Sequence, residues 1–303
     1  MTATVYAIAG GKGGVGKSTT AVNLGATLRA TGRSVALVDA DLVMPNLQGI
    51  IGLSHEPTIH EVLSGTVSLA EACVERVIGT DEVGQLDVYP GSGTLDAYGQ
   101  ADPDRLADVV ETLAEDYDSL ILDTGTGLTH EVAVPLQLAD STIIVTTPAE
   151  VAVVDAIKTI RLIDHLDGTV GGMVVSRTCK GLSAAEIPER MGVAQLTTIP
   201  SFTGTVRDLL AAYRRLAVRL IAGPNVPPEA VTAQEGPAAM LTPAVVPPTE
   251  VDPNVSSEEG DKEQNGDADV PNNTTDSDTA SETDESDGPD SDDVPGWFTG
   301  MVD

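Results

Sequence analysis

Near its amino terminus the chain reads Ile8-Ala-Gly-Gly-Lys-Gly-Gly-Val-Gly-Lys-Ser-Thr-Thr20. This stretch fits the pattern G-x-x-x-x-G-K-[ST] through Gly11, Gly16, Lys17 and Ser18, with a second lysine, Lys12, inside it. Closely spaced glycines let the backbone curl so that successive N–H groups point inward at a phosphate. The motif's lysine then supplies positive charge at the β- and γ-phosphates, and its hydroxyl completes a Mg²⁺ coordination shell. The stretch therefore predicts a site for a nucleoside triphosphate with Mg²⁺.

The segments on either side have the patterns that this motif requires. Thr4–Ala9 is a short β-branched and apolar run, as expected of a buried strand in a parallel sheet. Ser18–Arg29 carries apolar residues at helical spacing and contains no proline. A glycine-rich turn without function is the alternative, and the flanking strand and helix argue against it.

Composition and charge change sharply after Gly223. Residues 1–223 contain 27 acidic and 15 basic residues, net −12, whereas residues 224–303 contain 20 acidic residues and one basic residue, net −19, which together give −31. The second segment is rich in Pro, Asp, Glu, Ser and Thr, and Trp297 and Phe298 are its only aromatic residues. Such a segment cannot bury enough apolar surface to offset the entropy of ordering. We expect one folded domain at 1–223 and a disordered acidic tail at 224–303.

The basic residues are mostly arginine, since only 5 of the 16 are lysine. An acidic, lysine-poor surface is typical of a protein that stays soluble in concentrated salt, where screening removes most self-repulsion. This indicates a halophilic source. An acidic protein from an ordinary cytoplasm is the alternative.

Cysteines and histidines predict no further site. Cys73 and Cys179 are far apart and belong to no C-x-x-C pair, so we expect small core residues rather than a metal site or a disulfide. The histidines lack ligand-like spacing and are expected in core or surface packing: His55, His60, His130 and His165. Because no run of 18 apolar residues occurs and the chain opens directly on a strand, we expect no signal peptide, no membrane span and a cytoplasmic protein.

Apolar runs and helical patterns alternate along residues 30–223. The expected strands are Ser34–Asp39, Leu86–Tyr89, Ser119–Asp123, Ser141–Thr147, Val170–Ser176 and Gln195–Ile199. Helical period is found at Pro103–Glu115, Val151–Leu166 and Val206–Ile221. This alternation predicts an α/β fold, with a doubly wound, mostly parallel sheet and helices on both of its faces. Ligands of such sheets bind at the carboxyl ends of the strands.

Carboxylates lie at two of those strand ends. Val35-Ala-Leu-Val-Asp-Ala-Asp41 ends the second strand with Asp39 and Asp41, and Leu120-Ile-Leu-Asp123 ends another with Asp123. Carboxylates beside a phosphate loop hold Mg²⁺ directly or through its waters. We predict that Ser18, Asp41 and Asp123 are the metal residues. Each aspartate taken alone has an alternative role in capping, Asp39 at the following turn and Asp123 at a helix.

Several motifs together resemble one family. They are Lys12-Gly-Gly-Val-Gly-Lys17-Ser18-Thr19, Asp39-Ala-Asp41 followed by Pro45-Asn46-Leu47, the strand-end Asp123, and Thr147-Pro148-Ala-Glu150. They resemble the deviant Walker A ATPases of the MinD/ParA family, which are P-loop NTPases, and the resemblance runs along essentially all of 1–223. It implies an ATP-dependent homodimer in which Lys12 reaches the other subunit's phosphates, much as an arginine finger would. It also implies that Asp41 helps to position the attacking water and the metal, and that hydrolysis reverses dimerisation and partner binding.

The resemblance completes the predicted site. Lys12 and Asp41 are its catalytic residues, and ATP and Mg²⁺ are its cofactors. The predicted nucleotide-binding residues are Gly11, Lys12, Gly13, Gly14, Val15, Gly16, Lys17, Ser18, Thr19, Ser176 and Arg177.

The chain departs from the family pattern in three places. Thr124-Gly-Thr-Gly127 replaces the proline and small residue that usually follow the strand-end aspartate, which makes this switch segment more flexible. Ser176-Arg177 stands where the family often has Asn-Arg at the adenine edge, so base recognition is expected to rest on backbone and on Arg177 stacking. The third departure is the acidic tail, which replaces the basic amphipathic helix by which well-known MinD proteins bind membrane.

Several functions compete within the resemblance. Spatial regulation of cell division, cell shape, motility or chemotaxis machinery is favoured over ParA-like chromosome or plasmid partitioning, and a non-hydrolysing nucleotide-binding adaptor is a third candidate. Partitioning needs a basic surface for DNA, and DNA is not an expected partner of so acidic a chain, whose basic cluster is Arg207, Arg214, Arg215 and Arg219. Iron–sulfur scaffolds and nitrogenase reductase relatives need cysteines at spacings that this chain lacks.

The large apolar residues in the last part of the tail cluster around Trp297 and Phe298. Aromatic side chains on an extended tether suit a pocket on an unidentified protein partner. A purely solubilising tail and a weak membrane insertion are the alternatives.

Overall fold

The computed structural model describes residues 3–77, 85–177, 181–183, 185–201 and 206–222. Cys179, the boundary after Gly223, and the tail with Trp297 and Phe298 lie outside the described residues. Among the described helices, none is long and apolar enough to cross a membrane.

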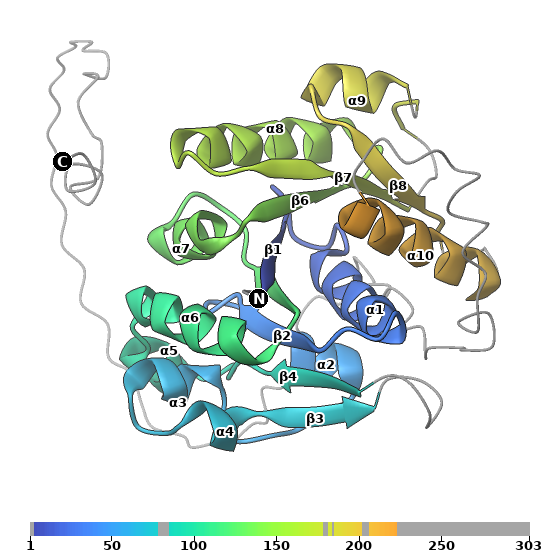
Figure 1. Cartoon of the computed structure of the whole chain (residues 1–303). Helices are drawn as coiled ribbons and strands as arrows, with labels where there is room; N and C mark the ends of the chain where they lie inside the picture. The colour runs from blue at the N-terminus through green and yellow to red at the C-terminus, as the bar shows by residue number, and fades with distance from the viewer. Residues whose placement is uncertain (1–2, 78–84, 178–180, 184, 202–205, 223–303) are drawn as a thin grey trace, which may run out of the picture. The chain divides into compact units, whose positions relative to one another are not determined.

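An eight-stranded sheet with the order β3-β4-β2-β5-β1-β6-β7-β8 forms the centre of the described part (Figure 1). Every neighbouring pair is parallel except β3 with β4, which is antiparallel. The strands are β1 (Thr4–Ala9), β2 (Val35–Ala40), β3 (Val74–Val77), β4 (Gln85–Tyr89), β5 (Ser119–Thr124), β6 (Ser141–Thr146), β7 (Val170–Ser176) and β8 (Gln195–Ile199). Every residue of β2 and of β5 is buried, as expected of strands covered on both faces.

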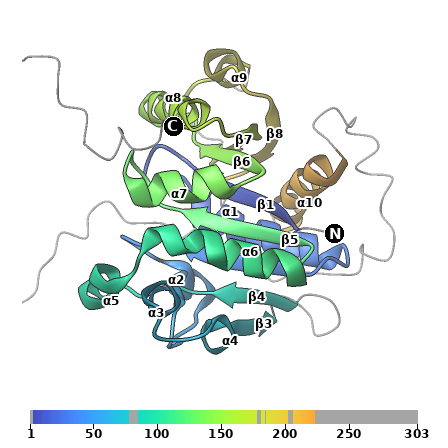
Figure 2. The ribbon, with the colours of Figure 1, turned by 60° about the vertical axis from the view of Figure 1, so that its left-hand side comes forward.

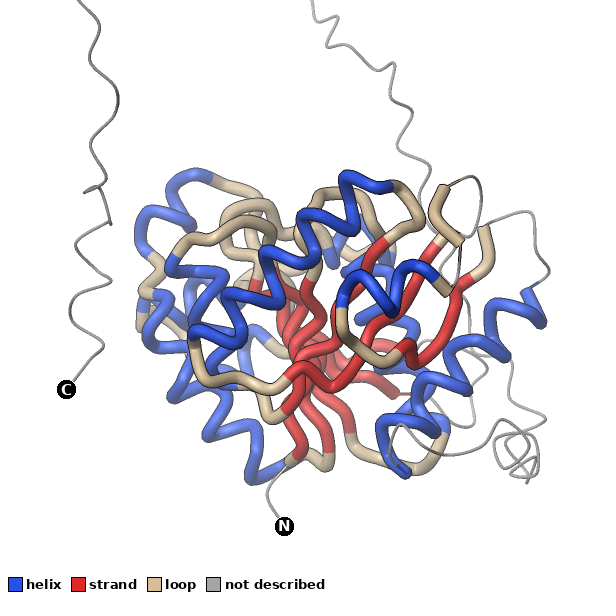
Figure 3. The backbone as a smooth tube through the Cα atoms, turned by 90° about the horizontal axis from the view of Figure 1, so that it is seen from above, coloured by secondary structure: helices blue, strands red, loops and turns tan. Residues whose placement is uncertain are grey.

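Helices cover both faces of this sheet, as the view from above shows (Figure 3). One face packs against α1 (Lys17–Ala30), α2 (Leu47–Ile51) and α10 (Val206–Ala222). The other packs against α3 (Ile59–Ser64), α6 (Leu106–Asp116), α7 (His130–Leu138), α8 (Glu150–His165) and α9 (Glu186–Met191). Figure 2 shows α6 and α7 on the near side of β5, with α1 on the far side. The predicted fold class is therefore confirmed.

The remaining described elements are short. They are α4 (Leu69–Ala72), α5 (Leu95–Gln100) and a 3₁₀ turn, Pro103–Arg105, which leads into α6. Each predicted strand or helix ends within one residue of an observed end, once this turn is counted with α6. Cys73 is half-buried against the core rather than fully buried within it.

Strand β1 lies at the point where the chain changes direction across the sheet. Its neighbours are β5 on one side and β6 on the other. The chain passes from β1 through α1 to β2, on the β5 side, and later adds β6, β7 and β8 on the opposite side. Ligands of open parallel sheets bind at the carboxyl ends of the strands at such a switch point. The segment that leaves β1 there is the glycine-rich stretch.

Candidate nucleotide-binding site

The glycine-rich loop joins β1 to the amino terminus of α1, in the context that its motif predicts. Gly16 is the residue before the helix and has φ +98°, a left-handed conformation that other residues rarely adopt. Gly11 lies so close to α8 that an added Cβ would come 2.1 Å from the backbone carbon of Asp155. Both positions therefore require glycine. The N–H groups of the first turn of α1, which contains no acidic residue, form a site suited to phosphate.

The two lysines of the loop have different environments. Lys17 is 8% exposed, and Lys12 is exposed to solvent. Burial lowers the pKa of Lys17, and the charges of Asp123 and Asp41 oppose that effect. Lys17 thus places a cation inside the site beside two carboxylates. Lys12 presents its ammonium group at the surface of the same loop.

Two aspartates lie buried at the carboxyl ends of adjacent strands. Asp39 on β2 and Asp123 on β5 are 0% and 1% exposed and stand at paired positions in the sheet. Burial, aided by the charge of Asp123, raises the pKa of Asp39 well above its usual range. Burial raises the pKa of Asp123 to about 7, although nearby Ser18 and Lys17 act in the opposite direction. Such a pair is costly to keep charged, which is typical of a site completed by a ligand.

Hydrogen bonding leaves part of this carboxylate pair unsatisfied. Among the described residues, no hydrogen-bond partner reaches Asp39 Oδ1 or either carboxyl oxygen of Asp123. Asp39 Oδ2 accepts a 3.2 Å hydrogen bond from the backbone N–H of Leu47 at the start of α2. The capping role that was the alternative for Asp39 is therefore observed. The remaining oxygens are suited to bind a hydrogen-bond donor or a cation.

Asp41 directly follows β2, two residues after Asp39, and is half-buried. Its Oδ1 accepts a 3.0 Å hydrogen bond from the backbone N–H of Met44. It also packs against the loop after β5, because a Cβ added to Gly125 would lie 2.9 Å from the same oxygen. The loops that follow β2 and β5 thus meet at this carboxylate.

The donor set suits a hydrated Mg²⁺ ion bound with phosphates. Ser18 is 9% exposed at the start of α1, close enough to Asp123 to affect its pKa. In the described part of the chain, no three Asp, Glu, His or Cys side chains form a ready-made metal cage. Mg²⁺ usually takes one or two protein ligands and fills its octahedron with water and substrate phosphates. Ser18, Asp41 and Asp123 fit this mode, and the bound ion would neutralise developing phosphate charge.

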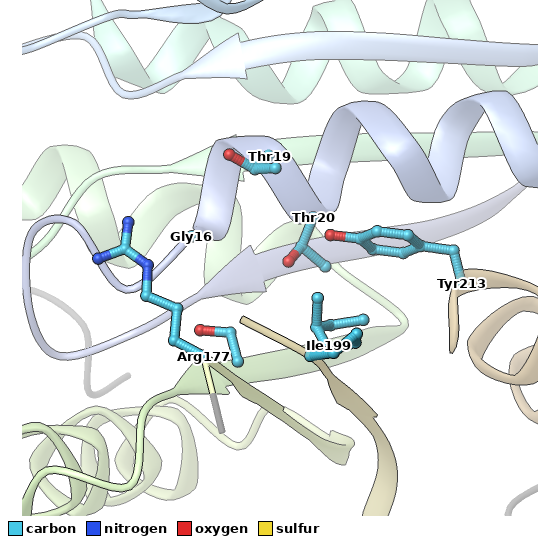
Figure 4. A pocket seen from close by; sticks show the side chains of 8 residues that line it. Gly16, Thr19, Thr20, Arg177, Ile199 and Tyr213 are labelled. Atoms are coloured by element: carbon cyan, nitrogen blue, oxygen red, sulfur yellow. The ribbon is translucent and has the colours of Figure 1, made fainter. Parts of the chain in front are cut away.

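A pocket next to the phosphate loop has the position expected for a nucleobase (Figure 4). Its lining comes from the loop, α1, the ends of β7 and β8, and α10: Gly16, Thr19, Thr20, Ser176, Arg177, Ile199, Pro200 and Tyr213. Tyr213 is 2% exposed, and its hydroxyl points toward Thr20. Burial raises the pKa of Tyr213 to about 12, so this phenol stays protonated.

Ser176 and Arg177, which the sequence assigns to base recognition, both line this pocket, and Ser176 also contacts the phosphate loop. Its Oγ donates a 2.5 Å hydrogen bond to the backbone carbonyl of Val15, while the side chain is 5% exposed. Arg177 has φ +53°, an uncommon backbone conformation for a residue other than glycine. The sequence did not indicate Thr20, Ile199, Pro200 or Tyr213, because they come from elements that only the fold brings together.

Comparisons with known proteins show which proteins this chain is similar to. The AAA domain family matches residues 3–170. An uncharacterised ATP-binding protein of Methanocaldococcus jannaschii is 34% identical over 174 residues, 57% of this chain and 64% of that protein. The septum site-determining protein MinD of Bacillus subtilis is 34% identical over 160 residues, 52% of this chain and 58% of that protein. The match thus spans less than two thirds of the length of either relative.

A solved structure extends the likeness beyond the matched sequence. The septum site-determining protein MinD of Pyrococcus horikoshii, complexed with Mg-ADP, superposes with a TM-score of 0.66 at 25% identity. The superposition covers 73% of this chain and 98% of that chain. With its phosphate loop, its strand-end carboxylates and more than half of its length matched, this chain belongs to the MinD/ParA family of P-loop ATPases.

Proposed function

We propose that this chain is a Mg²⁺-dependent ATPase that dimerises when ATP is bound and so acts as a spatial regulator. Its targets would be the machinery of cell division, cell shape, motility or chemotaxis. The observation that carries this proposal is that the two lysines of the phosphate loop differ in burial. Lys17 is buried beside Asp123, where it can neutralise the chain's own nucleotide, whereas Lys12 is exposed and can reach a second copy.

Exposed apolar side chains at the edge of the sheet that carries the phosphate loop also support a dimer. Large side chains exposed by about half or more follow β2, β5 and β6: Val43 at 54%, Met44 at 73%, Leu128 at 55% and Val151 at 59%. These strands end at the edge where the phosphate loop leaves β1. Apolar side chains grouped on one edge favour burial against a partner. A second copy facing this edge would cover them and bring its own Lys12 toward the nucleotide.

The residues of the site would have different roles in hydrolysis. Lys17 and the N–H groups at the start of α1 bind and orient the phosphates, in a partly desolvated setting where fixed charges act strongly. Ser18, Asp41 and Asp123 would hold the ion, which when bound neutralises charge on the transferred phosphate. Asp41, half-buried where the loops after β2 and β5 meet, would orient the attacking water. The N–H of Met44 fixes this carboxylate.

Substitutions of the two lysines test the proposal. Lys17→Ala should abolish nucleotide binding, measured by calorimetry, because the phosphates lose their buried counter-charge. Lys12→Ala should keep ATP binding and lose the ATP-dependent doubling of mass in light scattering. Lys158→Ala is the matched control, because Lys158 is exposed on α8 and pairs with Asp155. Wild-type protein whose mass does not change with ATP would exclude the dimer mechanism, and wild-type protein that binds but never hydrolyses ATP would leave an adaptor.

The acidic tail is proposed to recruit a protein partner through Trp297 and Phe298, and thereby to bring a cytoplasmic protein to its place of action. Deletion of residues 224–303 should leave ATPase activity intact and change the location of the tagged protein in cells. Trp297→Ala combined with Phe298→Ala should have the same effect. Normal location and an unchanged set of co-purifying proteins in the double variant would leave the tail a solubilising role only.

A further inference from the structure

His60 is a fully buried histidine outside the residues assigned above. It lies in the first turn of α3 and is 0% exposed. Its Nε2 lies 3.0 Å from the backbone carbonyl of Leu42, and its Nδ1 accepts a 3.1 Å hydrogen bond from the backbone N–H of Ser92. Both ring nitrogens are thus used, and both contact backbone of loops at the carboxyl edge of the sheet.

These contacts define the form of the ring. Nδ1 must be an acceptor, because the group facing it is an N–H. The proton of the neutral imidazole therefore lies on Nε2 and is donated to the carbonyl of Leu42. A protonated ring would set one N–H against another. The neutral Nε2–H tautomer is consequently the one that joins the two loops.

The loop that His60 joins to the Asp41 loop is itself anchored. The loop after β4 has further bonds: the N–H of Ile59 donates to the carbonyl of Pro90 at 2.8 Å, and the side chain of Gln48 donates to the carbonyl of Gly91 at 3.0 Å. The loop after β2 carries Asp41, which is followed directly by Leu42 and then by the exposed Val43 and Met44. His60 therefore ties the Asp41 loop to a well-anchored neighbour.

We propose that His60 is a positioning residue for Asp41. It acts through the Leu42 carbonyl, one residue from the carboxylate, and does not touch nucleotide or metal itself. The inference rests on the proposed function, since it assigns His60 a part in hydrolysis by Asp41. Errors of about 1 Å in the placement of a catalytic group can lower turnover about a hundredfold.

Two conservative variants separate the two hydrogen bonds of the ring. The amide of His60→Gln can reach the position of Nε2 and donate to Leu42, but it leaves the N–H of Ser92 without its acceptor. The carbonyl of His60→Asn can take the place of Nδ1 and accept from Ser92, but it leaves Leu42 without its donor. Both variants lose one buried hydrogen bond, so a role in stability alone predicts similar effects. A role in positioning predicts different ones.

The test uses the full-length protein, with His55→Asn as control because His55 contacts the carbonyl of Glu71 at an exposed site. We expect His60→Asn to lower ATP turnover about tenfold, a measurable loss of positioning, while ATP affinity stays within about twofold of wild type. We expect faster hydrogen–deuterium exchange of the Met44 amide in the same variant. His60→Gln should stay close to wild type in all three measurements.

Equal loss of turnover and protection in the two variants, or wild-type behaviour of His60→Asn, would overturn the inference. If wild-type protein does not hydrolyse ATP, the proposed function fails on its own. Hydrogen–deuterium exchange at Met44 then decides the role of His60. Faster exchange in His60→Asn but not in His60→Gln supports the positioning role, and any other pattern overturns it.

Discussion

The hydroxyl of Ser176 donates a 2.5 Å hydrogen bond to the backbone carbonyl of Val15, which joins the end of β7 to the middle of the phosphate loop. The two residues are 161 positions apart in the sequence. Ser176 also lines the pocket beside α1. One side chain therefore lines the pocket proposed for the base and also bonds to the backbone of the loop proposed for the phosphates, so it links the two parts of the proposed nucleotide site.

Ser176→Ala should weaken the binding of ATP and of GTP by a similar factor. The lost hydrogen bond, worth about 1 kcal/mol, holds the loop and reads no base, so an effect of about fivefold is expected for both nucleotides. Calorimetry with each nucleotide measures it. Thr197→Ala is the control, because it removes a hydroxyl-to-carbonyl bond between β8 and α10. A large loss for ATP with none for GTP would instead assign Ser176 to base recognition.

The central strands and the loop were predictable because each is encoded locally. The continuous apolar runs of β1, β2 and β5 and the glycine spacing of the loop need no distant contact to be recognised. Strand β3 was missed because it has only four residues, Val74-Glu75-Arg76-Val77, and forms by antiparallel pairing with β4. Helix α7 was missed because Pro135 lies inside it, where proline normally disfavours a helix.

The motif residues of the site were predictable from the sequence, and the contacts that depend on tertiary structure were not. Lys17, Ser18 and Asp123 come together as their motifs indicated, because parallel strands end at one edge. The pocket with Tyr213 was not predictable, because its walls come from α1, β7, β8 and α10. The bond from Ser176 to Val15 and the two loop contacts of His60 likewise depend on tertiary structure, and no local pattern signals them.

Gly125→Ala should lower ATP turnover more than ATP affinity. The new methyl group would lie 2.9 Å from Oδ1 of Asp41, which must move away from its bond with the N–H of Met44. We expect a loss of turnover of about tenfold or more, because the carboxylate proposed to orient the attacking water is displaced while Lys17 is untouched. Steady-state kinetics and calorimetry separate the two effects. Gly93→Ala is the control, since a Cβ there meets no atom within 4 Å; equal behaviour of the two variants would contradict this role of Asp41.

Salt should stabilise the protein. Residues 1–223 carry a net charge of −12, and repulsion among like charges opposes the compact state. Raising KCl from about 0.1 M to about 1 M shortens the Debye length from about 10 Å to about 3 Å and screens most of this repulsion. The unfolding midpoint in urea should therefore rise with KCl. Sorbitol at equal osmolarity controls for solvent effects without charge, and a midpoint that falls with KCl would show that attractive ion pairs dominate instead.

The buried carboxylates should make the nucleotide-free protein less stable as pH rises. Burial raises the pKa of Asp39 well above its usual range and that of Asp123 to about 7, so between about pH 4 and pH 7 the folded state holds more protons than the unfolded state. The contribution of these groups to the free energy of unfolding is then fully present below about pH 4 and is lost as pH rises through the folded pKa values. Urea unfolding in EDTA at several pH values measures this slope.

Asp39→Asn should flatten that slope and raise stability at pH 7.5 by about 1–2 kcal/mol, since it removes the cost of burying an ionisable carboxyl group while its amide oxygen can still accept from the N–H of Leu47. Asp118→Asn is a control of opposite sign. Asp118 is exposed and accepts hydrogen bonds from the N–H and Oγ of Ser34, which lower its pKa, so its loss should destabilise at neutral pH. Saturating Mg-ATP should reduce the advantage of Asp39→Asn, because a bound cation favours the ionised carboxyl group and so offsets the cost of burying it. A neutral-pH stability of Asp39→Asn equal to or below that of wild type would mean that Asp39 is already compensated within the protein alone.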